Sequence, residues 1–179
     1  MRGNLHKNTI RIAVTAVFTA LIAVSSYISF PLPSGVPVTL QTLTVALAGY
    51  CLGIKFAVPA VLAYILLGLI GAPVFSGFLS GPAVVMGKTG GFIIGFLFLV
   101  FGCALAEVWK NKSLKIVVGE IGLLLCHLLG VLWFSFLTKT GFWASAAAVS
   151  LPFLLKDALC VVGAMLLSLK LSKIIRRIE

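Results

Sequence analysis

The chain has few charged residues and very few acidic ones. Only 10% of its 179 residues are charged and only four are Asp or Glu, whereas about 25% of the residues of a typical soluble protein are charged. Hydrophobic residues make up 61% of the chain, against about 45–50% in soluble proteins. This composition excludes an ordinary soluble fold and predicts an integral membrane protein, with room for a single domain, 1–179.

Several functional classes lack their sequence signals. The four cysteines have no metal-like spacing, and the basic residues lie in separate turns rather than on one face, which argues against nucleic-acid binding. The stretch GPAVVMGKTG is similar to a phosphate-binding loop, but five residues separate Gly81 from Gly87 where that motif has four. We therefore expect no cofactor and no metal ion in the protein, and no nucleotide at the GPAVVMGKTG stretch.

Six apolar stretches predict six transmembrane helices, because the longest of them approach the roughly 20 residues that cross a bilayer. A Pro-rich turn follows the first stretch, and an apolar loop broken by Gly and Pro, 71–91, separates the third from the fourth. A cleaved signal peptide is disfavoured because the first apolar run is too long. The predicted fold is all-α, with an apolar outer loop between helices three and four. The six stretches are 8–30, 40–54, 56–71, 91–109, 114–138 and 151–175.

The distribution of Lys and Arg predicts the orientation. Eleven of the fourteen fall at the chain ends and in the turns of one side. Only Lys88, Lys139 and Lys156 fall on the other side. By the positive-inside rule, both termini are expected in the cytoplasm, and the protein is expected to be a multi-pass component of the bacterial cell membrane. The net charge of +10 then also favours contact with anionic lipid headgroups.

Polar residues cluster at the outer end of the second predicted helix. Thr39, Gln41, Thr42 and Thr44 occupy four of six consecutive positions. We interpret them as polar groups that line a pocket, with the 71–91 loop as its wall or lid. The alternatives are hydroxyls bonded back to their own helix, Gln41 cross-linking two helices, and a loop that rests in the headgroup layer without a ligand.

Asp157 is the second outer feature. It lies about two turns inside the last helix, or roughly 9 Å at about 1.5 Å per residue. A charge at that depth is costly unless it is paired or faces a wet cavity, so it is a candidate functional residue. Its neighbour Lys156 has a stem flexible enough for the two charges to meet. A structural ion pair between helices is the alternative.

Two further patterns lie on the first and fifth predicted helices. On the fifth, Glu120 and His127 share a face, and we interpret them as an interfacial acid and a hydrogen-bonded core histidine rather than a proton relay. The first helix carries a stripe of small residues that permits close helix approach in lipid, either within the chain or with another subunit. The stripe consists of Ala13, Ala16, Ala20 and Ala23.

Four stretches, in order and at suitable spacing, resemble the BioY family, the biotin-binding subunits of energy-coupling factor (ECF) vitamin transporters. They are VPVTLQTLTVALAGYCLG (36–53), YILLGLIGAPVFSG (64–77), GKTGGFIIGF (87–96) and LPFLLKDALC (151–160). The resemblance implies a non-enzymatic subunit that captures biotin outside the cell. It also implies docking of the alanine stripe on a transmembrane coupling subunit that carries two ATPases.

The resemblance also assigns a binding site. Asp157 is expected to accept a hydrogen bond from the ureido N–H of biotin, and Lys156 to donate to the ureido oxygen or to pair with Asp157. The predicted substrate-binding residues are Thr39, Gln41, Thr42, Phe75, Thr89, Gly90, Gly91, Phe92, Lys156 and Asp157. The chain departs from the family pattern at Cys160, where the family has Lys, and at Lys88, where it has Pro.

Two alternatives remain open. One is a binding subunit for a different vitamin. The other is a small intramembrane enzyme that uses Asp157 with His127 or Cys160. The enzyme is disfavoured because Asp157 is expected near the outer face and His127 at about mid-membrane, with no pairing between a nucleophile and a base.

Overall fold

The computed structural model describes the backbone of residues 2–178 and the side chains of residues 8–175 and 177. The basic side chains of Arg2, Lys7 and Arg176, which contribute to the charge asymmetry, lie outside the described residues. The six predicted helical stretches appear as the six longer helices of this part of the chain, so the prediction is confirmed as far as a mostly helical fold. These helices are α1 Arg2–Tyr27, α2 Gln41–Leu52, α3 Ile54–Leu69, α5 Gly90–Leu105, α6 Lys112–Thr138 and α8 Leu151–Ile178.

Helices of two lengths make up this set. Within the described residues, four stretches are long and apolar enough to cross a membrane, and they lie in α1, α5 with the turn after it, α6 and α8. Helices α2 and α3 are apolar but shorter, with 12 and 16 residues. Large apolar side chains cover the outside of the bundle; Leu66, Leu124 and Leu155, for example, are 58%, 54% and 74% exposed. A surface of this kind suits lipid rather than water.

The connections between the longer helices contain short elements that the sequence prediction did not include. The predicted irregular loop 71–91 forms two of them, and the last connection forms α7, whose eight residues are too few to cross a bilayer. Pro82 stands at the start of α4, where its missing N–H is tolerated. The short elements are β1 Ser29–Phe30, β2 Val38–Thr39, η1 Ser76–Phe78, α4 Pro82–Val85, η2 Ala106–Val108 and α7 Phe142–Val149.

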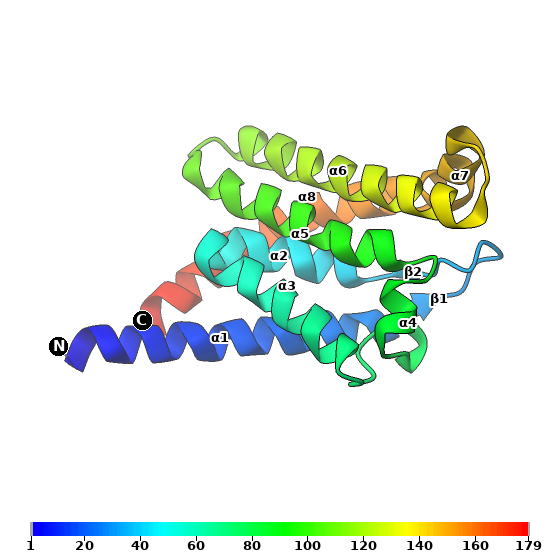
Figure 1. Cartoon of the computed structure of the whole chain (residues 1–179). Coiled ribbons are helices and arrows are strands. Elements are labelled where there is room, and N and C mark those ends of the chain that lie inside the picture. Colours follow the sequence, from blue (N-terminus) through cyan, green and yellow to red (C-terminus); the bar gives the residue numbers. More distant parts are fainter. Residues whose placement is uncertain (1, 179) are drawn as a thin grey trace.

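The two ends of the bundle differ. Both chain ends lie at one end, and β1, β2, α4 and α7 gather at the opposite end (Figure 1). The two strands pair in antiparallel fashion, with Ser29 opposite Thr39 and Phe30 opposite Val38. This pairing folds the Pro-rich turn back over the end of the bundle, so that the chain enters α2 beside the end of α1.

Helices α5 and α6 run side by side (Figure 1) and approach each other through glycines. A Cβ placed on Gly102 would lie 2.9 Å from the Cα of Gly122, and a Cβ on Gly122 would lie 2.9 Å from the carbonyl oxygen of Phe98. Neither contact is tolerable, so the two backbones pack as closely as they do only because these positions lack side chains. Small residues play this role between helices in lipid, where packing rather than hydrophobicity drives association.

We predict that Gly102→Ala destabilises the protein by about 1–3 kcal/mol, because the new methyl group forces α5 away from α6. Gly163→Ala is the matched control, since a Cβ at this position of α8 meets only Leu43 Cδ1, at 3.9 Å, and alanine favours a helix. Thermal unfolding of the detergent-purified variants measures both effects. Equal midpoints for the two variants would contradict this account of the α5–α6 contact.

Candidate functional site

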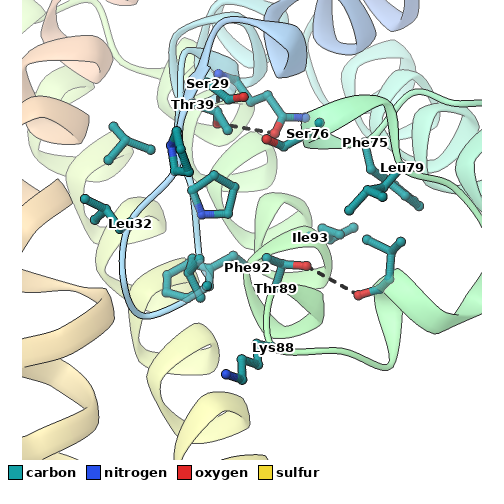
Figure 2. Close-up of a pocket in the computed structure, with 18 of the residues that line it drawn as sticks. Ser29, Leu32, Thr39, Phe75, Ser76, Leu79, Lys88, Thr89, Phe92 and Ile93 are labelled. Atoms are coloured by element: carbon teal, nitrogen blue, oxygen red, sulfur yellow. Dashed lines mark hydrogen bonds between the residues drawn. The ribbon is translucent and has the colours of Figure 1, made fainter.

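A cavity of about 620 Å³ opens at the end of the bundle that holds β1, β2 and α4. Its walls come from the turn between α1 and α2, from α3, from the segment between α3 and α5, and from the starts of α2, α5 and α8. Small-molecule sites usually measure about 300–1,000 Å³ and are mainly apolar, with a few placed polar groups. Figure 2 labels lining residues from the turn between α1 and α2, from the segment between α3 and α5 and from the start of α5.

The polar cluster of the second helix lies in this wall. Thr39, Gln41 and Thr42 all line the cavity. The Thr39 hydroxyl donates to Gln41 Oε1 at 3.3 Å, and Gln41 Nε2 donates to the hydroxyl of Tyr64 on α3 at 2.7 Å. Thr44 Oγ1 bonds back to the Gln41 carbonyl oxygen at 3.0 Å. Both sequence-based interpretations therefore apply in part, since Gln41 faces the cavity and also cross-links two helices.

Asp157 is buried in the cavity wall and is held from three helices. Its side chain is only 9% exposed, and its Oδ1 lies 2.5 Å from Lys156 Nζ, so the predicted meeting of these two charges is confirmed. Its Oδ2 lies 3.3 Å from Nε2 of His127 on α6, and the Thr42 side chain of α2 is a further polar neighbour. Lys156 Nζ also donates to the Thr39 carbonyl oxygen at 2.6 Å. A buried carboxylate requires such partners, because an unpaired one is costly to desolvate.

The expected separation of His127 from Asp157 is wrong. Helix α6 has 27 residues and is about 40 Å long, which exceeds the roughly 30 Å of a bilayer core. The intervening α7 lets α6 extend beyond the start of α8. The C-terminal end of α6 and the N-terminal end of α8 therefore lie at different depths. His127, counted from the first, lies level with Asp157, counted from the second. The interpretation of His127 as a hydrogen-bonded core histidine is confirmed, because its ring bonds to both Asp157 and Ser150.

Ser150, His127 and Asp157 form an arrangement similar in outline to a hydrolase triad, but it does not face the cavity. Asp157 lines the cavity, whereas neither Ser150 nor His127 is among its lining residues. Ser150 is 9% exposed and His127 is 5% exposed. A substrate in the cavity therefore has no approach to the serine oxygen, and the arrangement does not constitute an active site.

Aromatic side chains form the apolar part of the wall. The predicted residues Phe75 and Phe92 both line the cavity. Phe75 stands edge-on to Tyr64, with ring centroids 5.6 Å apart, and Phe92 stands edge-on to Phe153 at 6.4 Å. Tyr64 and Phe153 are lining residues that the sequence reasoning missed. A tyrosine within an apolar helix was the available signal for Tyr64, since a buried tyrosine hydroxyl usually has a hydrogen-bond partner.

The glycine-rich start of α5 is only partly in the wall. Thr89 lines the cavity, and its hydroxyl bonds to the Val84 carbonyl oxygen at 3.4 Å (Figure 2). Gly90 and Gly91 are not among the lining residues. A Cβ on Gly90 would overlap the Val85 carbonyl oxygen, and one on Gly91 would overlap the Trp133 side chain of α6. Both glycines thus serve the packing of α5 against α4 and α6.

Acidic residues near the other end of the bundle take no part in the cavity. Lys115 pairs with Glu107 at 2.6 Å. Glu120 does not line the cavity, and its Oε1 is buried with no hydrogen-bond partner among the described residues. Within the same residues, no group of three or more His, Cys, Asp or Glu side chains could hold a metal ion.

The alanine stripe of α1 is mostly free. Ala13, Ala16 and Ala20 are exposed, whereas Ala23 is half-buried and packs on the core. The opposite face of α1 makes the internal contacts, because Phe18 and Ile22 are buried there. Three of the four alanines therefore do not serve packing within the described part of the chain.

Comparison with known proteins gives consistent matches. Residues 1–177 match the BioY family model. A biotin transporter BioY of Thermotoga maritima is 38% identical over 159 residues, which cover 88% of this chain and 93% of that protein. A probable biotin transporter BioY of Pyrococcus horikoshii is 34% identical, with 89% and 94% covered.

A solved structure matches as well. The crystal structure of the S-component for biotin from an ECF-type ABC transporter superposes with a TM-score of 0.85 and 26% sequence identity. The match covers 93% of this chain and 92% of that one. These relatives are transporters, not enzymes. The extent of the family match and the identity to the relatives agree with the fold, and the chain belongs to the BioY family.

Proposed function

We propose that this protein is the biotin-binding membrane subunit of an ECF-type vitamin uptake transporter and that it binds biotin in the cavity at the end of the bundle. The observation that carries the proposal is Asp157, a buried carboxylate in the wall of a mainly apolar cavity of suitable volume. The relatives described as biotin transporters and as an S-component for biotin support the choice of ligand.

The chemistry of biotin fits this wall. Its ureido group has two N–H donors and one carbonyl acceptor, and the fused rings around it are largely apolar. An ionised carboxylate is a strong acceptor for an N–H group, since a charge-assisted hydrogen bond is stronger than a neutral one. Asp157 Oδ1 has no hydrogen-bond partner of good geometry among the described residues and lies beside the ammonium of Lys156. On binding, this ammonium moves to the ureido oxygen and an N–H group takes its place at Oδ1.

Lys88 is the second cation of the cavity wall and matches the other end of biotin, a carboxylate on a flexible chain. Lys156 is engaged by Asp157, whereas Lys88 is exposed and its stem lies against Gly35. In Figure 2, Lys88 lies beyond Thr89, away from Thr39 and Ser76. We place the ureido group beside Asp157 and the carboxylate beside Lys88. The hydroxyls of Thr39 and Thr42 then bond to polar atoms of the ligand between these two ends.

The membrane arrangement that we propose has six spans. In the described part of the chain, four helices are long enough by themselves. Helices α2 and α3 would cross as short spans of about 18 and 24 Å, which a locally thinned bilayer accommodates. The Lys and Arg distribution supports cytoplasmic termini in a bacterial cell membrane. The position of both chain ends opposite the cavity is consistent with a pocket that opens outward (Figure 1).

Energy for uptake would come from other chains. The similarity of GPAVVMGKTG to a nucleotide loop fails on spacing, and it lies at the cavity end of the bundle. We propose that the exposed alanines of α1, with Ala23 at their end, dock on a transmembrane coupling subunit that carries two ATPase subunits. Exposed methyl groups at helical spacing let a partner helix approach closely in lipid.

For the binding site, we predict that Asp157→Asn weakens biotin binding by more than about tenfold, equivalent to about 1.4 kcal/mol, because a neutral amide is a weaker acceptor. Equilibrium binding of radiolabelled biotin to purified protein measures the change. Glu120→Gln is the control, since it removes a half-buried acid outside the cavity, and it should change affinity by less than about twofold. Wild-type affinity in the Asp157 variant would remove this residue from the site, and failure of the wild type to bind biotin while binding another vitamin would support the alternative ligand.

For the ligand's anionic end, we predict that Lys88→Gln weakens the binding of biotin by about three- to tenfold, or about 0.7–1.4 kcal/mol. The same variant should bind biotin amide, whose tail is uncharged, as well as the wild type does. Lys139→Gln removes another exposed lysine, one that does not line the cavity, and serves as the control. Equal losses for biotin and its amide would refute a charge contact at Lys88.

For docking, we predict that Ala16→Leu and Ala20→Leu abolish co-purification with the coupling subunit, because the larger side chains hold the partner helix away. Biotin binding by the isolated variants should remain at the wild-type level, since neither position lines the cavity. Leu21→Ala, which shortens an exposed side chain next to the stripe, is the control. Loss of biotin binding with docking intact would show that the stripe packs inside the chain.

A further inference from the structure

His127 contacts the cavity wall from behind. It is 5% exposed and does not line the cavity itself. Its Nε2 lies 3.3 Å from Asp157 Oδ2, and its ring stands edge-on to Phe92, with centroids 5.8 Å apart. Both of these partners line the cavity, one on α8 and one on α5. A change at His127 is therefore transmitted to two sides of the site.

Hydrogen-bond complementarity determines the direction of the contacts at this ring. An ionised carboxylate is only an acceptor, so Nε2 must carry the proton that it shares with Asp157 Oδ2. In a neutral imidazole the other nitrogen is then an acceptor. Nδ1 lies 2.9 Å from Ser150 Oγ, and the serine hydroxyl can donate to it. For a neutral ring, the chain of bonds runs from the Ser150 hydroxyl to His127 Nδ1 and from His127 Nε2–H to Asp157 Oδ2.

Ser150 is itself fixed by the backbone at the junction of α7 and α8. Its N–H donates to the Ala146 carbonyl oxygen at 3.0 Å, and its own carbonyl oxygen accepts from the N–H groups of Phe153 and Leu154, each at 3.0 Å. The Ser150 end of this hydrogen-bond chain is thus anchored to both helices. Through His127, α6 is tied to the same point, so contacts with α6, α7 and α8 together hold the carboxylate in position.

We propose that His127, supported by Ser150, positions the Asp157 carboxylate for the ligand without touching the ligand. The bond to Oδ2 holds the carboxylate plane so that Oδ1 stays beside the Lys156 ammonium in the cavity wall. Without it, Oδ2 is a buried acceptor that has lost a donor, and the carboxylate rotates to share the Lys156 ammonium. Pre-organisation of this kind is a large part of the affinity of a small-ligand site. The inference rests on the proposed binding of biotin.

Two substitutions of similar size separate positioning from packing. In His127→Gln, the amide N–H group can take the place of Nε2–H, and we expect biotin affinity within about threefold of the wild type. In His127→Leu, the volume is kept but the donor is lost, and we expect affinity to fall by more than about tenfold. If the leucine variant binds as well as the glutamine variant, His127 only fills space and the proposal is overturned.

A double-mutant cycle tests whether the effect passes through Asp157. In an Asp157→Asn background, the glutamine and leucine variants at position 127 should bind biotin with the same affinity, within about twofold. A tenfold difference that persists in that background would show that His127 acts by another route. Elution of each variant as a single species from gel filtration identifies those that fold.

A ligand-free measurement keeps this inference separate from the proposed function. The sequence has two histidines, so His6→Gln leaves His127 as the only one. The ¹⁵N shifts of its ring in detergent micelles should identify a neutral ring protonated at Nε2, and Ser150→Ala should shift only the Nδ1 signal strongly. A ring protonated at Nδ1 overturns the proposed hydrogen-bond chain. If the chain is present but the wild type binds no biotin, the proposed ligand is wrong and the contact between His127 and Asp157 stands.

Discussion

The whole site depends on one buried carboxylate that must be stabilised in a medium of low polarity. Asp157 has a cation beside it on its own helix, a histidine on α6 and a threonine on α2. A charge at this depth is tolerated only when such partners surround it, so the acid constrains how three helices meet. The same constraint keeps a strong acceptor in a mainly apolar wall.

Close helix packing provides the frame for this arrangement. Glycines let α5 and α6 approach until their backbones touch, which places Phe92 of α5 against His127 of α6. The turn between α1 and α2 folds back through its short strand pair and carries Thr39 to Lys156. The cavity is thus bounded by elements that are each held by contacts outside it. A preformed wall of this kind suits a subunit whose task is capture rather than chemistry.

Sequence reasoning predicted several residues of the cavity wall but did not identify the neighbours of others. Thr39, Gln41, Thr42 and the Lys156–Asp157 pair were predicted as members of one pocket, and they line one cavity. Gly90 and Gly91 were assigned to ligand approach, whereas their neighbours are Val85 and Trp133. A glycine signals that something approaches the backbone closely. It does not identify what approaches.

The sequence alone indicated that this protein lies in a membrane, where its six helical stretches are, and which polar and charged residues interrupt apolar runs. Composition and the length of apolar runs are local quantities, and a charge in an apolar run is visible without coordinates. Only the tertiary structure decided that His127 meets Asp157 and that Ser150 lies behind it. Their contact depends on how far α6 extends past the start of α8, which α7 and the packing of three helices set together. No local pattern records the relative depth of two helices that are separate in the chain.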